Sequence, residues 1–141
     1  MSERQYWLIK SEPTVYPFAQ LQNEGKTSWT GVRNFEARNN LRKMEPGDLA
    51  LYYQTGEGKE IVGVARVVSS PTADPTAPKE DWASVDLEPV TALKAPVSLS
   101  KIKSMRELAE FPLVTRSRLS VSPVRPKDFR RILALGKTSL P

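Results

Sequence analysis

The 141-residue sequence contains neither cysteine nor histidine. Without cysteine there is no disulfide bridge and no thiolate nucleophile, and the additional lack of histidine excludes Ser-His-Asp triads and the usual zinc sites. A glycine-rich phosphate loop is also missing, because Gly56-Glu57-Gly58 matches only a hairpin turn. Any catalysis must therefore use Lys, Asp, Glu, Tyr or Ser, and no metal or cofactor is expected.

Long apolar runs are absent as well. The N-terminal segment has only four consecutive apolar residues, Tyr6 to Ile9, which is too few for a signal peptide or a membrane span. The 12 prolines and 7 glycines are spread along the chain and form no linker. These features predict one domain over residues 1–141, long enough to bury a core, in a cytoplasmic protein.

Basic residues are concentrated in the last third of the chain. Residues 1–93 carry 10 basic and 13 acidic side chains, whereas residues 94–141 carry 11 basic and 3 acidic ones. A one-sided basic surface favours polyanions such as nucleic acid, although a solvated basic face without a partner has the same composition. The candidate phosphate contacts are Arg116, Arg125, Lys127, Arg130 and Arg131.

Hydrophobic periodicity and turn residues predict the strands. Residues 49–54 alternate between two faces, and residues 61–68 are apolar on both faces, which indicates a central strand. Further strands are expected at residues 6–10, from Trp82 to an end bracketed by Pro89 and Pro96, and within residues 115–124. Residues 69–80, with three prolines, are expected to form a surface loop.

Capping residues predict the helices. The first is expected from Pro17 to Glu24, ended by Gly25, and the second is capped by Asn34. A third is expected from Ser100 through Leu108 and a fourth from Pro126, with Phe129, Ile132 and Leu133 buried and Gly136 past its end. Because long parallel βαβ units are absent, these elements favour an α+β fold around a small mixed, largely antiparallel β-barrel flanked by short helices.

The segment from Trp29 to Leu41 carries more polar recognition chemistry than a core needs. Trp29 precedes Gly31, so a flat apolar ring adjoins backbone that a ligand can approach closely. On a helical wheel Asn34 and Arg38 border the buried stripe of the second helix. The pattern fits a planar ligand, and the plainer interpretation is a capped helix whose charges are solvated.

The other aromatic residues divide into core and pocket candidates. Trp7 and Tyr52 are assigned to the core, because an apolar aromatic ring is more often core than ligand cage. Tyr53, at a strand end, and Trp82, at a loop exit, are placed to line a pocket mouth together with Trp29.

Lys10, Ser11 and Glu12 lie where the first strand ends, a common position for functional groups. They are either an ordinary solvated strand end or, for a desolvated Lys10 beside Glu12, an acid–base pair. A nucleophilic pair of Ser11 and Lys10 is disfavoured, because adjacent residues seldom face each other and no oxyanion element is identifiable.

Seven segments, in order along the chain, match one family: residues 6–13, 29–34, 37–41, 47–49, 52–53, 61–64 and 118–124. In these segments the sequence resembles the EVE-domain proteins, including the thymocyte nuclear protein family and its short bacterial relatives. The resemblance implies a PUA-like barrel with an aromatic and polar pocket for a nucleobase, and a modified base, such as a modified cytosine in DNA, as the ligand.

Residues and resemblance together predict a non-catalytic, monomeric reader of nucleic acid, DNA or RNA, that carries a modified base. A base swung out of its strand would stack on Trp29 or Tyr53, and its edge would be read by Arg33, Asn34 and backbone groups. The full set of predicted pocket residues is Lys10, Ser11, Glu12, Trp29, Gly31, Val32, Arg33, Asn34, Arg38, Tyr53, Trp82, Arg118 and Ser120.

Two alternatives remain open at this level. The first is a small hydrolase of modified nucleosides, similar to the ASCH branch of the superfamily, with Lys10 and Glu12 as its acid–base pair. The second is an RNA-binding adaptor whose pocket does not select for modification.

Overall fold

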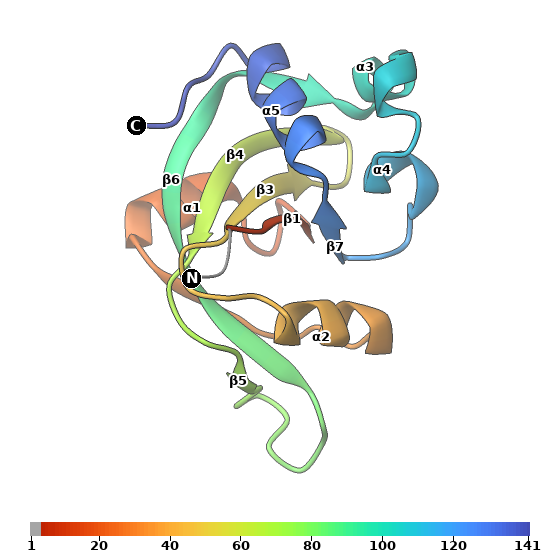
Figure 1. Cartoon of the computed structure of the whole chain (residues 1–141). Helices are drawn as coiled ribbons and strands as arrows, with labels where there is room; N and C mark the ends of the chain where they lie inside the picture. The colour runs from red at the N-terminus through yellow and green to blue at the C-terminus, as the bar shows by residue number, and fades with distance from the viewer. Residues whose placement is uncertain (1–3) are drawn as a thin grey trace.

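The structure, a computed structural model, describes residues 4–141, so the first three residues of the predicted domain lie outside the described range. Its centre is a mixed sheet that curls into a half-barrel (Figure 1), with strand order β2-β6-β4-β3-β1-β7 and the short β5 paired to β6. Among the described strands only β1 and β3 run parallel. The strands are β1 (Tyr6–Ser11), β2 (Thr27–Trp29), β3 (Leu49–Gln54), β4 (Glu60–Val67), β5 (Thr72–Ala73), β6 (Ala83–Ser98) and β7 (Val121–Val124).

Short helices cover both faces of the sheet. Buried side chains of α1 and α2 pack in one apolar cluster, and those of α3, η1, α4 and α5 pack in a second. The predicted α+β fold, a small, largely antiparallel β-barrel flanked by short helices, is confirmed, and the sheet forms a half-barrel. The helices are α1 (Phe18–Glu24), α2 (Phe35–Arg42), α3 (Leu99–Lys103), the 3-10 helix η1 (Arg106–Leu108), α4 (Pro112–Thr115) and α5 (Pro126–Leu135).

Alternation along the central strands divides the two clusters. Tyr52 of β3 packs with α1 and α2, whereas its neighbour Tyr53 points to the opposite face and packs with α5 and the other C-terminal helices. Tyr52 is a core residue, as predicted. The prediction that Tyr53 lines the pocket is wrong, because the ring is only 5% exposed and lies on the face away from Trp29.

Local capping signals place the ends of three helices correctly. Gly25 ends α1 with φ of 81°, a conformation that favours glycine. Asn34 Oδ1 accepts a hydrogen bond of 2.9 Å from the backbone N–H of Ala37 and caps α2. Pro126 begins α5, which buries Phe129 and Ile132 as predicted.

Other boundaries differ from the prediction. Strand β6 runs unbroken through Pro89 and Pro96, because register shifts against β4 release parts of it from regular pairing. The helix predicted from Ser100 to Leu108 is two short pieces, and its cap is Ser98, whose Oγ accepts from Lys101 N at 3.0 Å. Residues 112–115 are helical, so the strand predicted within 115–124 begins only at Val121.

Among the helices of residues 4–141, none has the length and apolar character that a membrane span requires.

Helix α2 is held to the opposite edge of the sheet by a buried hydrogen bond, from Asn40 Nδ2 to the carbonyl of Val121 in β7, at 2.7 Å. The chain between β2 and α2 lies beside the end of β1, where the candidate site lies.

Candidate functional site

A cavity of about 560 Å³ opens where β1 and β2 end and the chain turns into α2. We call it the Trp29 cavity. It gathers two separate stretches that the sequence marked, at the end of β1 and after Trp29, together with a residue just before β7. The lining residues are Lys10, Ser11, Glu12, Val15, Tyr16, Thr27, Ser28, Trp29, Thr30, Gly31, Val32, Arg33 and Ser120.

Trp29 is the large flat side chain of this cavity, and neighbouring aromatic rings fix its position. The Tyr52 ring meets it edge-on at 5.5 Å and 77°, and the Tyr16 ring at 6.4 Å and 78°. Tyr52 OH and Ser11 Oγ both donate to the carbonyl of Tyr16, at 2.6 and 2.7 Å. Burial raises the pKa of Tyr52 to about 12, so this hydroxyl remains a donor at neutral pH.

A buried carboxylate, Asp74, fixes the loop that forms the far wall of the cavity. Its Oδ2 accepts from Gly31 N at 2.8 Å and from Arg33 Nη1 at 3.0 Å, and its Oδ1 accepts from the backbone N–H and hydroxyl of Thr76. Burial alone would raise the pKa of this carboxyl, but the four donated hydrogen bonds hold it well below its usual range. Gly31, with φ of 81°, allows the loop to turn toward Asp74.

Lys10 does not form the acid–base pair considered from the sequence. Its half-buried amino group donates to the carbonyls of Ser117 and Arg116, at 2.8 and 3.3 Å, and within residues 4–141 it makes no ion pair with Glu12. Burial lowers the pKa of Lys10 from its usual value. The side chain thus ties the turn before β7 to the cavity, while the Glu12 carboxylate is exposed at the rim.

Asn34 and Arg118 belong to a second, smaller hollow of about 270 Å³ next to the Trp29 cavity. The Asn34 carbonyl oxygen is occupied as the cap of α2. Arg118 is exposed and, within the described part of the chain, its side chain has no hydrogen-bond or ion-pair partner. The predicted grouping of these two residues with Trp29 in one pocket is therefore corrected. Asn34 caps α2 and Arg118 lies in the turn before β7, and both border the second hollow instead of the Trp29 cavity.

Trp82 and Arg38 also lie outside the Trp29 cavity, on the outer surface of α2. The Trp82 ring stacks on Phe35 at 5.3 Å and an interplanar angle of 16°, so it covers the start of the helix instead of lining the pocket. The Arg38 guanidinium lies 5.0 Å from the centre of the Phe35 ring and donates to the carbonyl of Asp81 at 3.1 Å. Both predicted pocket assignments are corrected by this packing.

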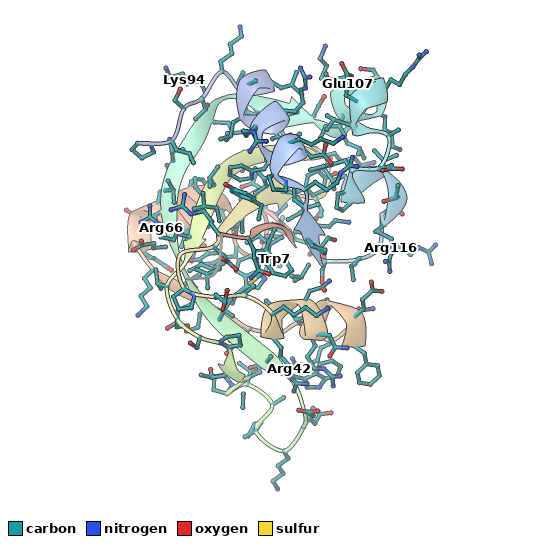
Figure 2. The ribbon with its side chains drawn as sticks, viewed as in Figure 1. Trp7, Arg42, Arg66, Lys94, Glu107 and Arg116 are labelled. Carbon is teal, nitrogen blue, oxygen red and sulfur yellow. The ribbon has the colours of Figure 1, made fainter. Side chains whose placement is uncertain are left out.

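The predicted phosphate contacts are spread over two regions. Arg116 projects from the turn before β7 (Figure 2), and both of its terminal nitrogens donate to the carboxylate of Glu36, which lowers the pKa of that carboxyl. Arg125 pairs with Asp128 and Glu110, each at 3.0 Å. The remaining three, Lys127, Arg130 and Arg131, are exposed on α5.

Strand register separates α5 from the cavity. Val124 of β7 is paired with Tyr6 of β1, and the Tyr6 ring stacks on Phe129 of α5 at 4.3 Å. The cavity begins at the other end of β1, at Lys10 and Ser11. With a rise of about 3.3 Å per residue, Ser11 lies roughly 16 Å from Tyr6 along the strand. The α5 cations therefore lie at the opposite end of the sheet.

Sequence reasoning missed several lining residues and the carboxylate behind them. Asp74-Pro75-Thr76 is a typical turn pattern, but nothing local indicates that Asp74 contacts Gly31, 43 residues away. Strand β2 is only three residues long and gives a weak periodic signal. The missed lining residues are Val15, Tyr16, Thr27, Ser28 and Thr30.

The fold and cavity define a small curled-sheet domain with a ligand-sized, aromatic and polar hollow at its strand ends. The EVE domain family model matches residues 5–135, and the chain belongs to the EVE-domain family. The resemblance seen in the motifs is thereby confirmed.

Curated relatives include mouse thymocyte nuclear protein 1, which is 32% identical over 94% of this chain and 74% of its own length. A second, uncharacterized protein C21.03c of Schizosaccharomyces pombe, is 34% identical over 99% of this chain and 71% of its own. In both relatives the match spans nearly the whole of this chain, and the relative has additional length.

Solved structures agree. Protein Atu2648 of Agrobacterium tumefaciens has a TM-score of 0.93 at 37% identity and covers 97% of this chain and 96% of its own. Human THYN1 protein, solved in complex with DNA containing 5-methylcytosine, has a TM-score of 0.88 at 27% identity, over 96% of this chain and 99% of its own. The ASCH protein of Zymomonas mobilis, at 13% identity over 94% of this chain and 96% of its own and a TM-score of 0.60, shares the fold alone.

Proposed function

We propose that this chain binds nucleic acid and accommodates a modified cytosine, swung out of its strand, in the Trp29 cavity. The observation that carries the proposal is the cavity itself, where an exposed part of a fixed indole faces polar groups at two strand ends. A relative with the same fold binds DNA containing 5-methylcytosine, which supports this choice of ligand.

The size and lining of the cavity suit a planar polar ligand. Its volume of about 560 Å³ is within the range of small-molecule sites. Trp29 offers a stacking face, and the exposed Glu12 carboxylate at the rim is an acceptor suited to the exocyclic amino group of cytosine. Arg33 and Asn34, predicted as base-reading residues, already hold Asp74 and cap α2, so we assign the reading to Glu12 and to backbone groups beside it.

The energies involved set the expected affinity. Extruding a base costs a few kcal/mol, stacking returns about 1–3 kcal/mol, and a good edge contact returns a similar amount. Binding to an intact duplex should therefore be weak, and binding to a single strand or a mismatched duplex stronger. A single methyl group is worth only about 1–3 kcal/mol, so discrimination against plain cytosine should be about 5- to 150-fold.

The direct experiment is a titration of matched oligonucleotides that differ only in one base. DNA and RNA strands with cytosine, 5-methylcytosine and thymine at the central position should be compared, single-stranded and in duplex. We expect the 5-methylcytosine strand to bind best and thymine, which lacks the amino group, to bind worst. Equal affinity for all three bases would rule out base reading.

Variants locate the binding to the cavity. Trp29→Ala should remove the preference for the modified base. Glu12→Gln should reduce the difference in affinity between the cytosine strand and the thymine strand. Tyr53→Phe is the matched aromatic control, because Tyr53 lies on the other face of the sheet. A Trp29→Ala protein that keeps its thermal stability and its base preference would contradict the assignment.

Phosphate contacts are proposed for Arg118, which is exposed, unpaired within residues 4–141 and next to the cavity through Ser120. Lys127 is an exposed cation on α5, which follows β7 near the far end of β1. Arg118→Ala should weaken binding to all strands alike and reduce the slope of log affinity against log salt by about one unit. If Lys127→Ala weakens binding more than Arg118→Ala does, the nucleic acid instead follows the α5 face. If the affinity of the wild-type protein does not change with salt, phosphate contacts are excluded.

A further inference from the structure

A second aromatic surface lies next to the Trp29 cavity and is not part of it. Phe35, the first residue of α2, is 67% exposed, and its ring stacks on Trp82 at 5.3 Å and 16°. We call this pair the Phe35–Trp82 stack. Within residues 4–141 the large apolar side chains that are this exposed are Phe35 and Val15, and Val15 lines the cavity. Both of these exposed apolar side chains thus lie at the Trp29 cavity or next to it.

Guanidinium groups surround the stack and are held in place. Arg38 lies 5.0 Å from the Phe35 ring centre and 5.9 Å from that of Trp82, and Arg33 lies 5.5 Å from Trp82. Arg38 is oriented by hydrogen bonds to Asn39 Oδ1, at 3.1 and 3.0 Å, and to the carbonyl of Asp81. The Phe35–Trp82 stack is therefore ordered before any ligand arrives, which reduces the entropy lost on binding.

Charge around the stack favours an anionic partner. Arg38 and Arg42 share one carboxylate, that of Asp81, so this trio keeps one net positive charge (Figure 2 shows Arg42 below α2). Arg33 connects the two surfaces, because it lines the Trp29 cavity and also lies over the Trp82 ring. A strand that leaves the cavity past Arg33 meets a flat ring flanked by the guanidinium groups of Arg33 and Arg38.

We propose that the exposed Phe35 ring stacks against a nucleobase next to the one held in the Trp29 cavity, so that the protein engages two neighbouring nucleotides. This inference rests on the proposed function. Every base has a π-face, so this second contact adds affinity without reading sequence. It also explains why a ring of this size remains exposed at the first position of a helix, where it contributes little to the core.

The test uses a single strand with 5-methylcytosine at its centre, in which each flanking nucleotide is replaced in turn by an abasic analogue. For wild type, removal of one flanking base should weaken binding about 5- to 150-fold, the range expected for one stacked base. Phe35→Ala should weaken binding to the complete strand by the same factor and should no longer respond to the abasic replacement. Phe35→Tyr should retain wild-type behaviour.

The substitution Phe35→Leu separates ring stacking from a purely apolar contact. Phe35→Leu keeps an apolar side chain without a ring, so it should behave like Phe35→Ala on the single strand. If Phe35→Leu binds that strand as tightly as wild type, an apolar contact suffices and the stacking proposal is overturned. Equal losses from the abasic replacement in wild type and Phe35→Ala would overturn it as well. Thermal unfolding should be nearly unchanged in all three variants, because the side chain is exposed.

The same variants distinguish failure of the second contact from failure of the proposed function. If Trp29→Ala abolishes base-dependent binding while Phe35→Ala binds with full affinity, the cavity reads the base and the second contact is refuted. Absence of binding to any strand refutes both.

Discussion

Replacement of Asp74 by asparagine tests whether a buried carboxylate organises the cavity wall. The side chain of Asp74 is fully buried, and its two oxygens receive four hydrogen bonds. An amide of the same shape offers one acceptor oxygen and one NH₂ group. If the amide oxygen keeps the hydrogen bonds from Gly31 N and Arg33, the NH₂ group faces Thr76. The Thr76 hydroxyl can rotate to accept a hydrogen bond from this NH₂ group, but the Thr76 backbone N–H is a donor and cannot.

The expected cost follows from this count. One N–H loses its partner, at about 1–3 kcal/mol, and the remaining bonds lose the strength that a charged acceptor gives. Arg33 is 39% exposed, so water partly compensates its lost ion pair. We expect the free energy of unfolding to fall by about 2–3 kcal/mol, which lowers Tm by roughly 6–12 °C for a chain of this length.

The assay is urea unfolding between pH 2 and 7, with Asp81→Asn as the matched control. The Asp81 carboxylate is 78% exposed in its pairs with Arg38 and Arg42, so its replacement should cost less than about 1 kcal/mol. The pKa of Asp74 is depressed in the folded state, so its contribution is complete above the unfolded carboxyl pKa of about 3.9 and is lost as the pH falls toward the folded value. The gap between wild type and Asp74→Asn should therefore narrow below about pH 4. A gap under about 0.5 kcal/mol at pH 7, or one that widens in acid, would refute the reasoning.

Further predictions concern single contacts. Asn34→Ala should lower the free energy of unfolding by about 1 kcal/mol and Asn34→Asp should not, because only the alanine variant loses the cap of α2. Gly63→Ala should cost about 1–3 kcal/mol in urea unfolding, since a Cβ there would overlap the Phe18 ring, whereas Gly58→Ala, with only ordinary contacts, should cost much less. In a spectroscopic titration Tyr52 should ionise near pH 12, because burial raises its pKa. The stability that this raised pKa contributes is present below about pH 10, the pKa of an unfolded tyrosine, and is lost as the pH rises above it. Tyr52→Phe should remove the ionisation near pH 12, and ionisation of Tyr52 near pH 10 would contradict the burial argument.

Local rules explain the parts of the site that were visible in the sequence. Lys10, Ser11 and Glu12 are consecutive at a strand end, and Trp29 and Gly31 are nearly so, and all five line the cavity. Capping residues such as Asn34 act within one helical turn, so helix starts could be predicted from short windows.

Long-range contacts explain what was missed. Alternation predicted that Tyr52 and Tyr53 face opposite sides, but which side holds the cavity depends on where α1 and β2 pack. Trp82 stacks on Phe35 through a contact 47 residues distant in the printed sequence, which no local pattern encodes. Asp74 was missed for the same reason. The composition of its loop predicts an exposed side chain, whereas contacts with distant residues such as Gly31 bury it.

The resonances of the three tryptophan indole N–H groups give the most direct test of the central claim, that a base enters the cavity beside Trp29. Trp7 Nε1 donates to the buried Asp48 carboxylate at 3.0 Å and serves as an internal reference. On addition of a strand with 5-methylcytosine, the Trp29 resonance should shift while that of Trp7 stays in place, and Trp82 should shift too if a neighbouring base stacks on Phe35. Saturated binding with an unmoved Trp29 resonance would contradict the central claim.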